Sequence, residues 1–397
     1  MTMTSRTLGD DGKQNMIYLD HQASTPMHPA ALAALSNSLL EHSANPHASE
    51  HAAGWAAADA IEEARAAIAT ALGGDADEIV FTSGATEANN LALLGTSDLS
   101  GRRGRVVVSS IEHKAVLGPG RELARRGFDV AVAPARRNGM VDAEALLELV
   151  DERTLLVSMM LVNNETGVVQ PIQEIVHSLA ASGALVHVDA AQALSWMPID
   201  ALVLGADMIS VSGHKMGGPK GVGALWIRRE IRHRVRPILY GGEQEDGLRP
   251  GTLPTPLCVS FGEACRHLPS VHEVDVWRAR TARLEAGLLA MFPGAHVNGA
   301  DRDRHPGAIS LTAPGVDAEA LVALLQPNVA VSRGSACTSG IPEPSHVLRA
   351  MGLSADECAA TFRVSTGRMT TDEEVTEALA HFETALARYR KERQHAA

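Results

Sequence analysis

The sequence predicts an α/β fold, with a large domain built on a mainly parallel β-sheet and a smaller α+β domain after it. Short apolar runs rich in β-branched residues recur at 78–83, 105–110, 155–162, 184–190 and 208–213. Helical patterns separate most of these runs, and the alternation weakens near residue 265. Strands that are apolar on both faces and alternate with helices are typical of a parallel sheet covered by helices on each side.

The other elements follow from the same reading of periodicity. Residues 1–15 show neither helical nor strand periodicity, so we expect a disordered extension. Ala-rich patterns predict helices at 30–40 and 56–72, with a loop between them. The apolar run at 221–229 follows 208–213 too closely for a crossover helix, and we therefore expect these two strands to be antiparallel.

Length and composition exclude several classes of protein. With 397 residues, 45% of them hydrophobic and 21% charged, the chain has an ordinary globular composition and room for two or three domains. A net charge of -12 argues against direct nucleic-acid binding, because a duplex-binding surface needs clustered Lys and Arg. Since no apolar stretch approaches the roughly 18 residues of a membrane helix and the N-terminus lacks a signal-peptide pattern, we expect a cytoplasmic protein without membrane contact.

The cysteines argue against disulfides and against a structural metal site. Cys258, Cys265, Cys337 and Cys358 form neither a CxxC pair nor a dense framework, so we expect free thiols and no metal. Cys258 and Cys265 lie in an apolar helical pattern, as buried cysteines do, whereas Cys337 lies among Ser, Thr and Gly at 330–340. Cys337 is therefore the candidate reactive thiol, although an unreactive loop thiol is the commoner outcome for any single cysteine.

Ligands of open α/β sheets bind beyond the carboxyl ends of the strands, so the residues after each apolar run are candidates for chemistry. In the motif at 82–90, Gly84 permits a tight turn, and the amides of Ala85 and Thr86 would then form an anion site at a helix N-terminus. Taken alone, this motif is more often an ordinary Thr-capped helix.

Two further strand ends carry charged residues. Asp189 would be delivered into a buried crevice, where a carboxylate needs a cationic partner such as the protonated ring nitrogen of pyridoxal phosphate. A helix N-cap is an equally common role for such an Asp. Lys215 follows the next strand between glycines and lies nearer to the strand end than Lys220, so we assign it as the cofactor-binding amine. A glycine-rich connection with surface lysines is the alternative.

His113 and Arg363 fit the same site. His113 follows the run at 105–110 and could lie on a ring face or transfer protons, although a structural histidine is the commoner outcome. Arg363 lies in an apolar run, where a substrate carboxylate or a structural ion pair would each balance its charge.

The order and context of these motifs closely resemble the cysteine desulfurases, fold-type I pyridoxal-phosphate enzymes of the class V aminotransferase group. The resemblance extends from the segment near residue 17 through 82–90, 187–192 and 210–223 to the segment around Arg363. It implies a seven-stranded sheet in a large domain at 30–265. It also implies a small domain made of 16–29 and 266–397, which carries the cysteine loop.

The resemblance also implies a role for each site residue. Lys215 would hold pyridoxal 5′-phosphate and act with His113 and Cys337 in catalysis, and Arg363 and Asn164 would bind the substrate L-cysteine. Asn164 would also lie near the cofactor, and Thr252 would reach the phosphate of a neighbouring subunit in a homodimer. The cofactor would further contact Ala85, Thr86, His113, Asp189, Gln192, Ser212 and His214.

The spacing after Cys337 resembles that of the subgroup with a long mobile cysteine loop, which passes sulfur to an acceptor or scaffold protein. Two departures from the family pattern fall on the N-terminal substrate contact and on the dimer loop: His21, Gln22 and Ser24 near the start, and Pro250 before Thr252. An aminotransferase, a selenocysteine lyase and a silent docking scaffold are the alternatives. Iron–sulfur clusters, thiolated tRNA, DNA phosphorothioate and cofactors all remain open as sulfur destinations.

Overall fold

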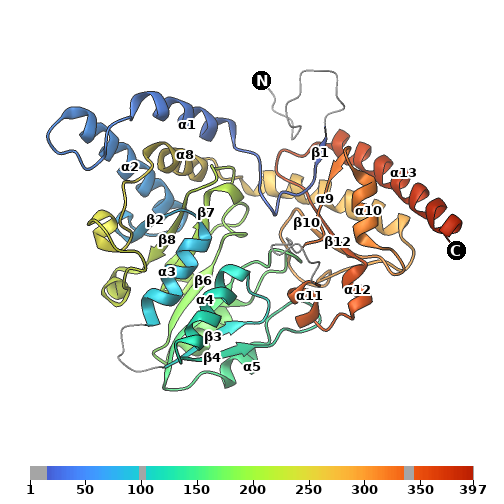
Figure 1. The fold of residues 1–397 in the computed structure, drawn as a ribbon, viewed down its shortest axis with the longest axis horizontal. Helices are drawn as coiled ribbons and strands as arrows, with labels where there is room; N and C mark the ends of the chain where they lie inside the picture. Colours follow the sequence, from blue (N-terminus) through green and yellow to red (C-terminus); the bar gives the residue numbers. More distant parts are fainter. Residues whose placement is uncertain (1–15, 98–103, 335–343, 397) are drawn as a thin grey trace.

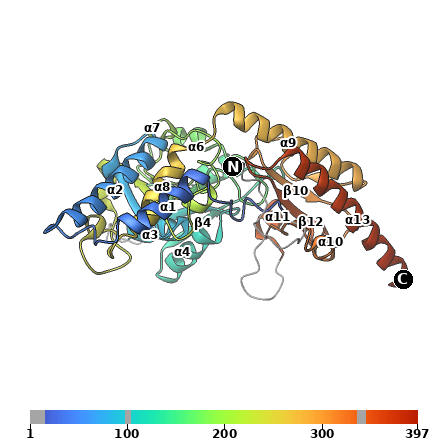
Figure 2. The same cartoon turned by 90° about the horizontal axis from the view of Figure 1, so that it is seen from above.

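The computed structural model of the protein describes residues 16–97, 104–334 and 344–396. The expected extension at 1–15 and the candidate thiol Cys337 lie outside these ranges. In Figures 1 and 2 the described chain forms two lobes, one around the large sheet and one around α9, β10, β12 and α13, and segment 16–29 crosses between them.

The first lobe contains a seven-stranded sheet in the order β2-β8-β7-β6-β5-β3-β4. Neighbours among β3 to β7 pair in parallel, and β8 is antiparallel to both β7 and β2. The expected antiparallel pair is therefore confirmed. The strands are β2 (Ile79–Thr82), β3 (Arg105–Ser109), β4 (Asp129–Ala133), β5 (Thr154–Met160), β6 (Leu185–Asp189), β7 (Met208–Ser212) and β8 (Gly223–Ile227).

Strand β4 was not predicted, and the antiparallel pairing of β2 was not predicted either. As the edge strand, β4 leaves Asp129 and Val132 exposed, so it lacks the continuous apolar run of the central strands. Strand β2 has such a run, but its partner in the sheet is β8, which follows β7 in the chain and is antiparallel to it.

Helices cover both faces of this sheet, and alternate strand residues face each layer. Val106 and Val108 pack in one core with α3 and α4, whereas Val107 packs in the other core with α2, α5, α6, α7 and α8. Helix α1 packs on α8. These helices are α1 (Pro29–Glu41), α2 (Ala52–Ala71), α3 (Ala85–Ser97), α4 (Lys114–Arg125), α5 (Ala143–Glu148), α6 (Ile172–Leu179), α7 (Ala201–Leu204) and α8 (Thr255–Arg266). Short 3₁₀ turns lie at Ala76–Glu78, Gly213–Lys215, Arg229–Arg234 and Gln244–Gly247.

The second lobe has its own apolar core, to which the N-terminal segment contributes Ile17 and Leu19. Its sheet has the order β12-β10-β9, and β1 pairs in parallel with β11. Isolated bridges join Asp20 to Ser365 and Ser332 to Arg363, which brings three distant segments together. The elements are β1 (Ile17–Tyr18), α9 (Val271–Met291), β9 (His296–Val297), β10 (Ala308–Thr312), α10 (Ala318–Leu325), β11 (Val329–Ala330), α11 (His346–Ala350), α12 (Ala355–Ala359), β12 (Thr361–Ser365) and α13 (Asp372–Ala396).

Candidate active site

The carboxyl ends of β2, β3, β5, β6 and β7 meet at one edge of the large sheet. Strand β2 runs in the same direction as β7, because both are antiparallel to β8. A cavity of about 560 Å³ lies beyond these ends. It is lined by ten of the predicted residues: Ala85, Thr86, His113, Asn164, Asp189, Gln192, Ser212, His214, Lys215 and Arg363.

The turn between β2 and α3 forms one end of the cavity. Gly84 has φ 146°, a conformation that only glycine adopts readily. Across the sheet, a Cβ atom at Gly223 would lie 2.6 Å from the Gly84 Cα, so the close approach of the turn to β8 requires glycine at 223. The first amides of α3 have no carbonyl one turn before them within the helix, and they can therefore bind an anion beside Ser212.

Asp189 ends β6 and lies buried on the floor of the cavity. Its Oδ2 accepts a hydrogen bond from Asn89 Nδ2 at 2.7 Å, and its Oδ1 accepts one from the Ala191 amide at 3.0 Å. Asp189 thus stabilises the turn after β6 and also faces the cavity. Asn89, on α3, was not predicted, because its contact with Asp189 spans 100 residues of sequence.

Lys215 lies at the end of the turn that follows β7. Its Nζ donates to the Gln22 carbonyl at 2.5 Å and to the Ala23 carbonyl at 2.9 Å. Burial, and then the nearby Arg363 charge, lower its pKa to about 8 against the partial opposition of Asp20 and Asp189. Lys220 also borders the cavity but is exposed. The geometry therefore favours Lys215 over Lys220 as the reactive amine.

Arg363 lies on the opposite wall, which is built from the second lobe. Its Nη2 donates to Asp20 Oδ1 at 2.7 Å and its Nη1 donates to the Asn164 carbonyl at 2.8 Å. The guanidinium Nε is buried without a hydrogen-bond partner in the described structure. Arg363 therefore combines a structural ion pair with a buried donor that has no partner in the described structure.

His113 caps the N-terminus of α4, since its Nδ1 accepts a hydrogen bond from the Ala115 amide at 3.1 Å. The neutral ring therefore carries its proton on Nε2. Burial lowers the pKa of His113; Asp189 opposes this change and Lys215 adds to it. A neutral imidazole at the cavity wall suits both stacking and proton transfer.

Two buried carboxyl groups near the cavity were not predicted. Glu112 accepts hydrogen bonds from Ser109 Oγ and the Met160 amide, and burial raises its pKa to about 8. Glu165 lines the cavity and accepts a hydrogen bond from Ser345 Oγ; burial raises its pKa as well. Each is a sequence neighbour of a residue that was singled out as a candidate: Glu112 directly precedes His113, and Glu165 directly follows Asn164.

His346 was also overlooked. It is the first residue of α11, it lines the cavity, and its Nε2 donates to the Glu112 carbonyl at 2.8 Å. With the Ser345–Glu165 bond, this contact fastens the start of α11 to the ends of β3 and β5. Thr252, in contrast, is exposed and does not line the cavity.

The cavity fits pyridoxal phosphate in size and in polarity. A volume of about 560 Å³ lies within the range of cofactor sites. Several polar atoms in or beside it are buried without a partner in the described structure, namely both side-chain heteroatoms of Gln22, Asn164 Oδ1 and Arg363 Nε. Groups of this kind need a partner, which a polar ligand would supply.

Comparison with known proteins gives a consistent result. The family model for aminotransferase class-V matches residues 17–378. The chain is 42% identical over 374 residues to a protein named cysteine desulfurase, mitochondrial, from Arthroderma benhamiae, a match that covers 93% of this chain and 74% of that protein.

Solved structures agree with this family and confirm the expected fold. A NifS-like protein superposes with a TM-score of 0.86 at 33% identity and covers 94% of this chain and 99% of its own. A structure described as SspA in complex with cysteine superposes with a TM-score of 0.80 at 37% identity, covering 89% of this chain and 99% of that one. The chain belongs to the aminotransferase class-V family.

Proposed function

We propose that this chain is a pyridoxal-phosphate-dependent cysteine desulfurase, which converts L-cysteine to L-alanine and transfers the sulfur to Cys337. The observation that carries the proposal is the convergence of Lys215, Asp189 and Arg363 on one cavity, in a chain 42% identical to a protein named as a cysteine desulfurase. The three side chains provide an amine, an acid and a carboxylate receptor, which are the groups that this chemistry requires.

Pyridoxal 5′-phosphate is the cofactor of this family, and when bound it supplies an aldehyde for covalent attachment and a ring that accepts electrons from the substrate Cα. In our proposal Lys215 would form the covalent bond and Asp189 would pair with the ring nitrogen. The amides of Ala85 and Thr86, together with Ser212 and His214, would hold the phosphate. Gln192 would contact the ring hydroxyl, and His113 would stack on the ring.

The opposite wall binds the amino acid. Arg363 Nε, which lacks a partner, would donate to the substrate α-carboxylate, and Asn164 Oδ1 would accept a hydrogen bond nearby. Lys215 Nζ, when neutral and not bonded to the cofactor, would take the Cα proton of the substrate. A pKa of about 8 leaves about a tenth of this amine neutral at pH 7.

Sulfur transfer requires a thiolate. Cys337 Sγ would attack the substrate sulfur, so that a sulfur–sulfur bond forms and the Cβ–sulfur bond breaks, with the electron pair passing to the carbon side. Protonation of that carbon yields alanine and leaves a persulfide on Cys337. His113 is our candidate for proton transfer in this step.

The proposal includes a homodimer, with Thr252 reaching the phosphate of the partner subunit. Thr252 is exposed, and large exposed apolar side chains occur on nearby elements: Leu39 and Leu40 on α1, Trp55 on α2, and Tyr240 in the loop that leads to Thr252. In Figure 1 α1, α2 and this loop lie at the same end of the first lobe. A second copy would bury this surface.

We further propose delivery of the sulfur to an acceptor protein in the cytoplasm, where iron–sulfur cluster assembly is one destination. Within the described ranges, no helix combines the length and apolar character needed to cross a bilayer.

The separate apolar cores of the two lobes support a division into domains at 30–265 and at 16–29 with 266–397.

The test is to incubate the purified protein with L-cysteine and a thiol reductant, and to measure alanine and sulfide. We expect equal amounts of the two products. The Cys337→Ala variant should keep the cofactor absorbance but release no sulfide. Full sulfide release by this variant would refute the role of Cys337, and alanine formation that requires an added keto acid would instead indicate transamination.

A further inference from the structure

Glu245 and Asp246 have a backbone conformation that is unusual for residues other than glycine. Their φ angles are 53° and 54°, and Gly247 follows with φ 77°. Three consecutive left-handed residues are unfavourable for an L-amino-acid chain, so neighbouring contacts must hold this loop in place. The loop belongs to the segment that continues to Thr252.

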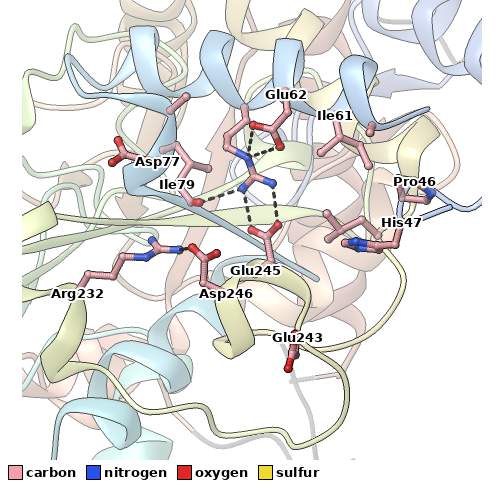
Figure 3. A pocket seen from close by; sticks show the side chains of 14 residues that line it. Pro46, His47, Ile61, Glu62, Asp77, Ile79, Arg232, Glu243, Glu245 and Asp246 are labelled. Atoms are coloured by element: carbon pink, nitrogen blue, oxygen red, sulfur yellow. Dashed lines mark hydrogen bonds and ion pairs between the residues drawn. The ribbon is translucent and has the colours of Figure 1, made fainter. Parts of the chain in front are cut away.

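The main contact is a buried ion pair between Glu245 and Arg65 of α2. Glu245 Oε1 accepts a hydrogen bond from Arg65 Nη2 at 2.7 Å, and Oε2 accepts one from Arg65 Nη1 at 2.8 Å. The exposed fractions of the two side chains are only 2% for Glu245 and 11% for Arg65. In Figure 3 the dashed lines from Glu62, Ile79 and Glu245 meet at one guanidinium, that of Arg65, beside a surface cavity.

The same ion pair covers the free edge of β2, which is an edge strand of the large sheet. Arg65 Nη1 donates to the Ile79 carbonyl at 3.0 Å, and Glu245 Oε2 accepts from the Phe81 amide at 2.7 Å. A carbonyl and the amide two residues later point to the same side of a strand. Arg65 and Glu245 therefore provide the donor and the acceptor that a neighbouring strand would otherwise provide.

A second ion pair ties the same segment to the turn after β2. Arg249 Nε donates to Glu87 Oε1 at 2.9 Å, and Glu87 Oε2 accepts from the Ser83 amide at 2.6 Å. The backbone is thus held at Phe81 and Ser83, immediately before the Gly84–Ala85–Thr86 turn. These contacts therefore restrict where the backbone amides of Ala85 and Thr86 can lie.

From this network we infer that Arg65 and Glu245 are positioning residues for the cofactor phosphate, which they affect through β2 and the turn at Gly84 without touching the ligand. The inference rests on the proposed function, because it assumes that the phosphate of pyridoxal phosphate binds at this turn. It predicts that loss of the ion pair weakens recognition of the phosphate and leaves recognition of the ring unchanged.

The experiment compares pyridoxal phosphate with pyridoxal, which lacks the phosphate, in titrations of the full-length apoprotein followed by absorbance. Glu245→Gln removes the negative charge and leaves a single acceptor oxygen. With that oxygen at the Oε2 position, the amide nitrogen replaces Oε1 as the neighbour of Arg65 Nη2 and cannot accept its hydrogen bond. We expect the Kd for pyridoxal phosphate to rise about 10-fold, the size of effect of losing one charge-assisted hydrogen bond. The Kd for pyridoxal should change by less than about 2-fold on the same reasoning.

Glu62→Gln is the matched control, because Glu62 contacts the same Arg65 at 3.0 Å but has a side chain that is 62% exposed. It should leave both dissociation constants unchanged. If Glu245→Gln does not fold, Arg65→Lys takes its place in the experiment. It keeps the charge but not the two-pronged contact, and it should raise the Kd for pyridoxal phosphate in the same way.

If Glu245→Gln raised the Kd for pyridoxal phosphate and the Kd for pyridoxal equally, or raised neither, the inference would be overturned. Failure of the wild-type apoprotein to bind pyridoxal phosphate would overturn the proposed function itself, so the two failures can be distinguished. Far-UV circular dichroism of each variant separates a local effect from unfolding.

Discussion

The two walls of the cavity are built in different ways. The wall with Asp189 and Lys215, proposed to bind the cofactor and here called the cofactor wall, consists of residues at the ends of neighbouring strands. The sheet register sets their relative positions: Met160 pairs with Asp189, and Asp189 pairs with Ser210. The substrate wall is held by isolated bridges between distant segments, such as Ser332 with Arg363, and by the Arg363–Asp20 ion pair.

This difference separates two kinds of function. A strand end and the turn that follows form a local unit, so each cofactor-facing group is specified by a short motif. Arg363 is useful only when Asp20, Asn164 and Ser332 reach it from other parts of the chain. We therefore expect substitutions on the first wall to change cofactor binding and turnover, and substitutions on the second to change the KM for L-cysteine.

The largest effect should come from Lys215→Ala on the cofactor wall. This change removes both covalent attachment and the acceptor of the Cα proton, and we expect kcat to fall by about 10⁴-fold or more. Mass spectrometry after borohydride reduction should show no cofactor bound to the chain. Persistent covalent labelling at another lysine would contradict the assignment.

The second prediction concerns pH and the same residue. A pKa of about 8 instead of 10.5 makes the neutral fraction of Lys215 about 300-fold larger at pH 7. The rate of cofactor attachment to the apoprotein should rise with pH, reach half of its maximum near pH 8 and level off above that pH, as measured by stopped-flow absorbance. Lys220→Ala should leave this profile unchanged, and a rate that still rises above pH 10 would show that the reacting amine is not desolvated.

The third prediction tests the substrate wall. Arg363→Lys replaces a planar two-pronged donor by a single ammonium group, so we expect the KM for L-cysteine to rise by about 10- to 100-fold. The Kd for pyridoxal phosphate should stay within about 2-fold of the wild-type value, since Arg363 belongs to the other wall. A large loss of cofactor affinity would break the division between the walls.

The smallest expected effect concerns Asn89, which connects α3 to the cofactor wall. Asn89→Ala removes one of the two hydrogen bonds that the Asp189 carboxylate accepts, worth about 1 kcal/mol, and should lower kcat about 5-fold. Neighbouring Asn90, which donates to the Thr86 carbonyl on the exposed side of α3, provides a control variant for helix stability. An unchanged kcat for Asn89→Ala would show that Asp189 is held by the strand alone.

Several structural features could be predicted because they depend on local physics. Apolar runs and helical periods identified the central strands, and the short connection to 221–229 identified the antiparallel pair. The edge strand β4 escaped prediction because its exposed side chains weaken the apolar signal. Asn89, Glu165 and His346 were not predicted as site residues, because their importance comes from contacts with residues distant in the sequence.

The sequence by itself determined the fold class and the chemistry available at each strand end, since strand, turn and glycine patterns are local properties of the chain. Only the tertiary structure decided how far Lys215 is buried and that Asp20 binds the Arg363 guanidinium. It also decided that Arg65 and Glu245 supply hydrogen-bond partners to the free edge of β2. Burial and ion pairing depend on groups that are distant in sequence, and no local pattern encodes their distances.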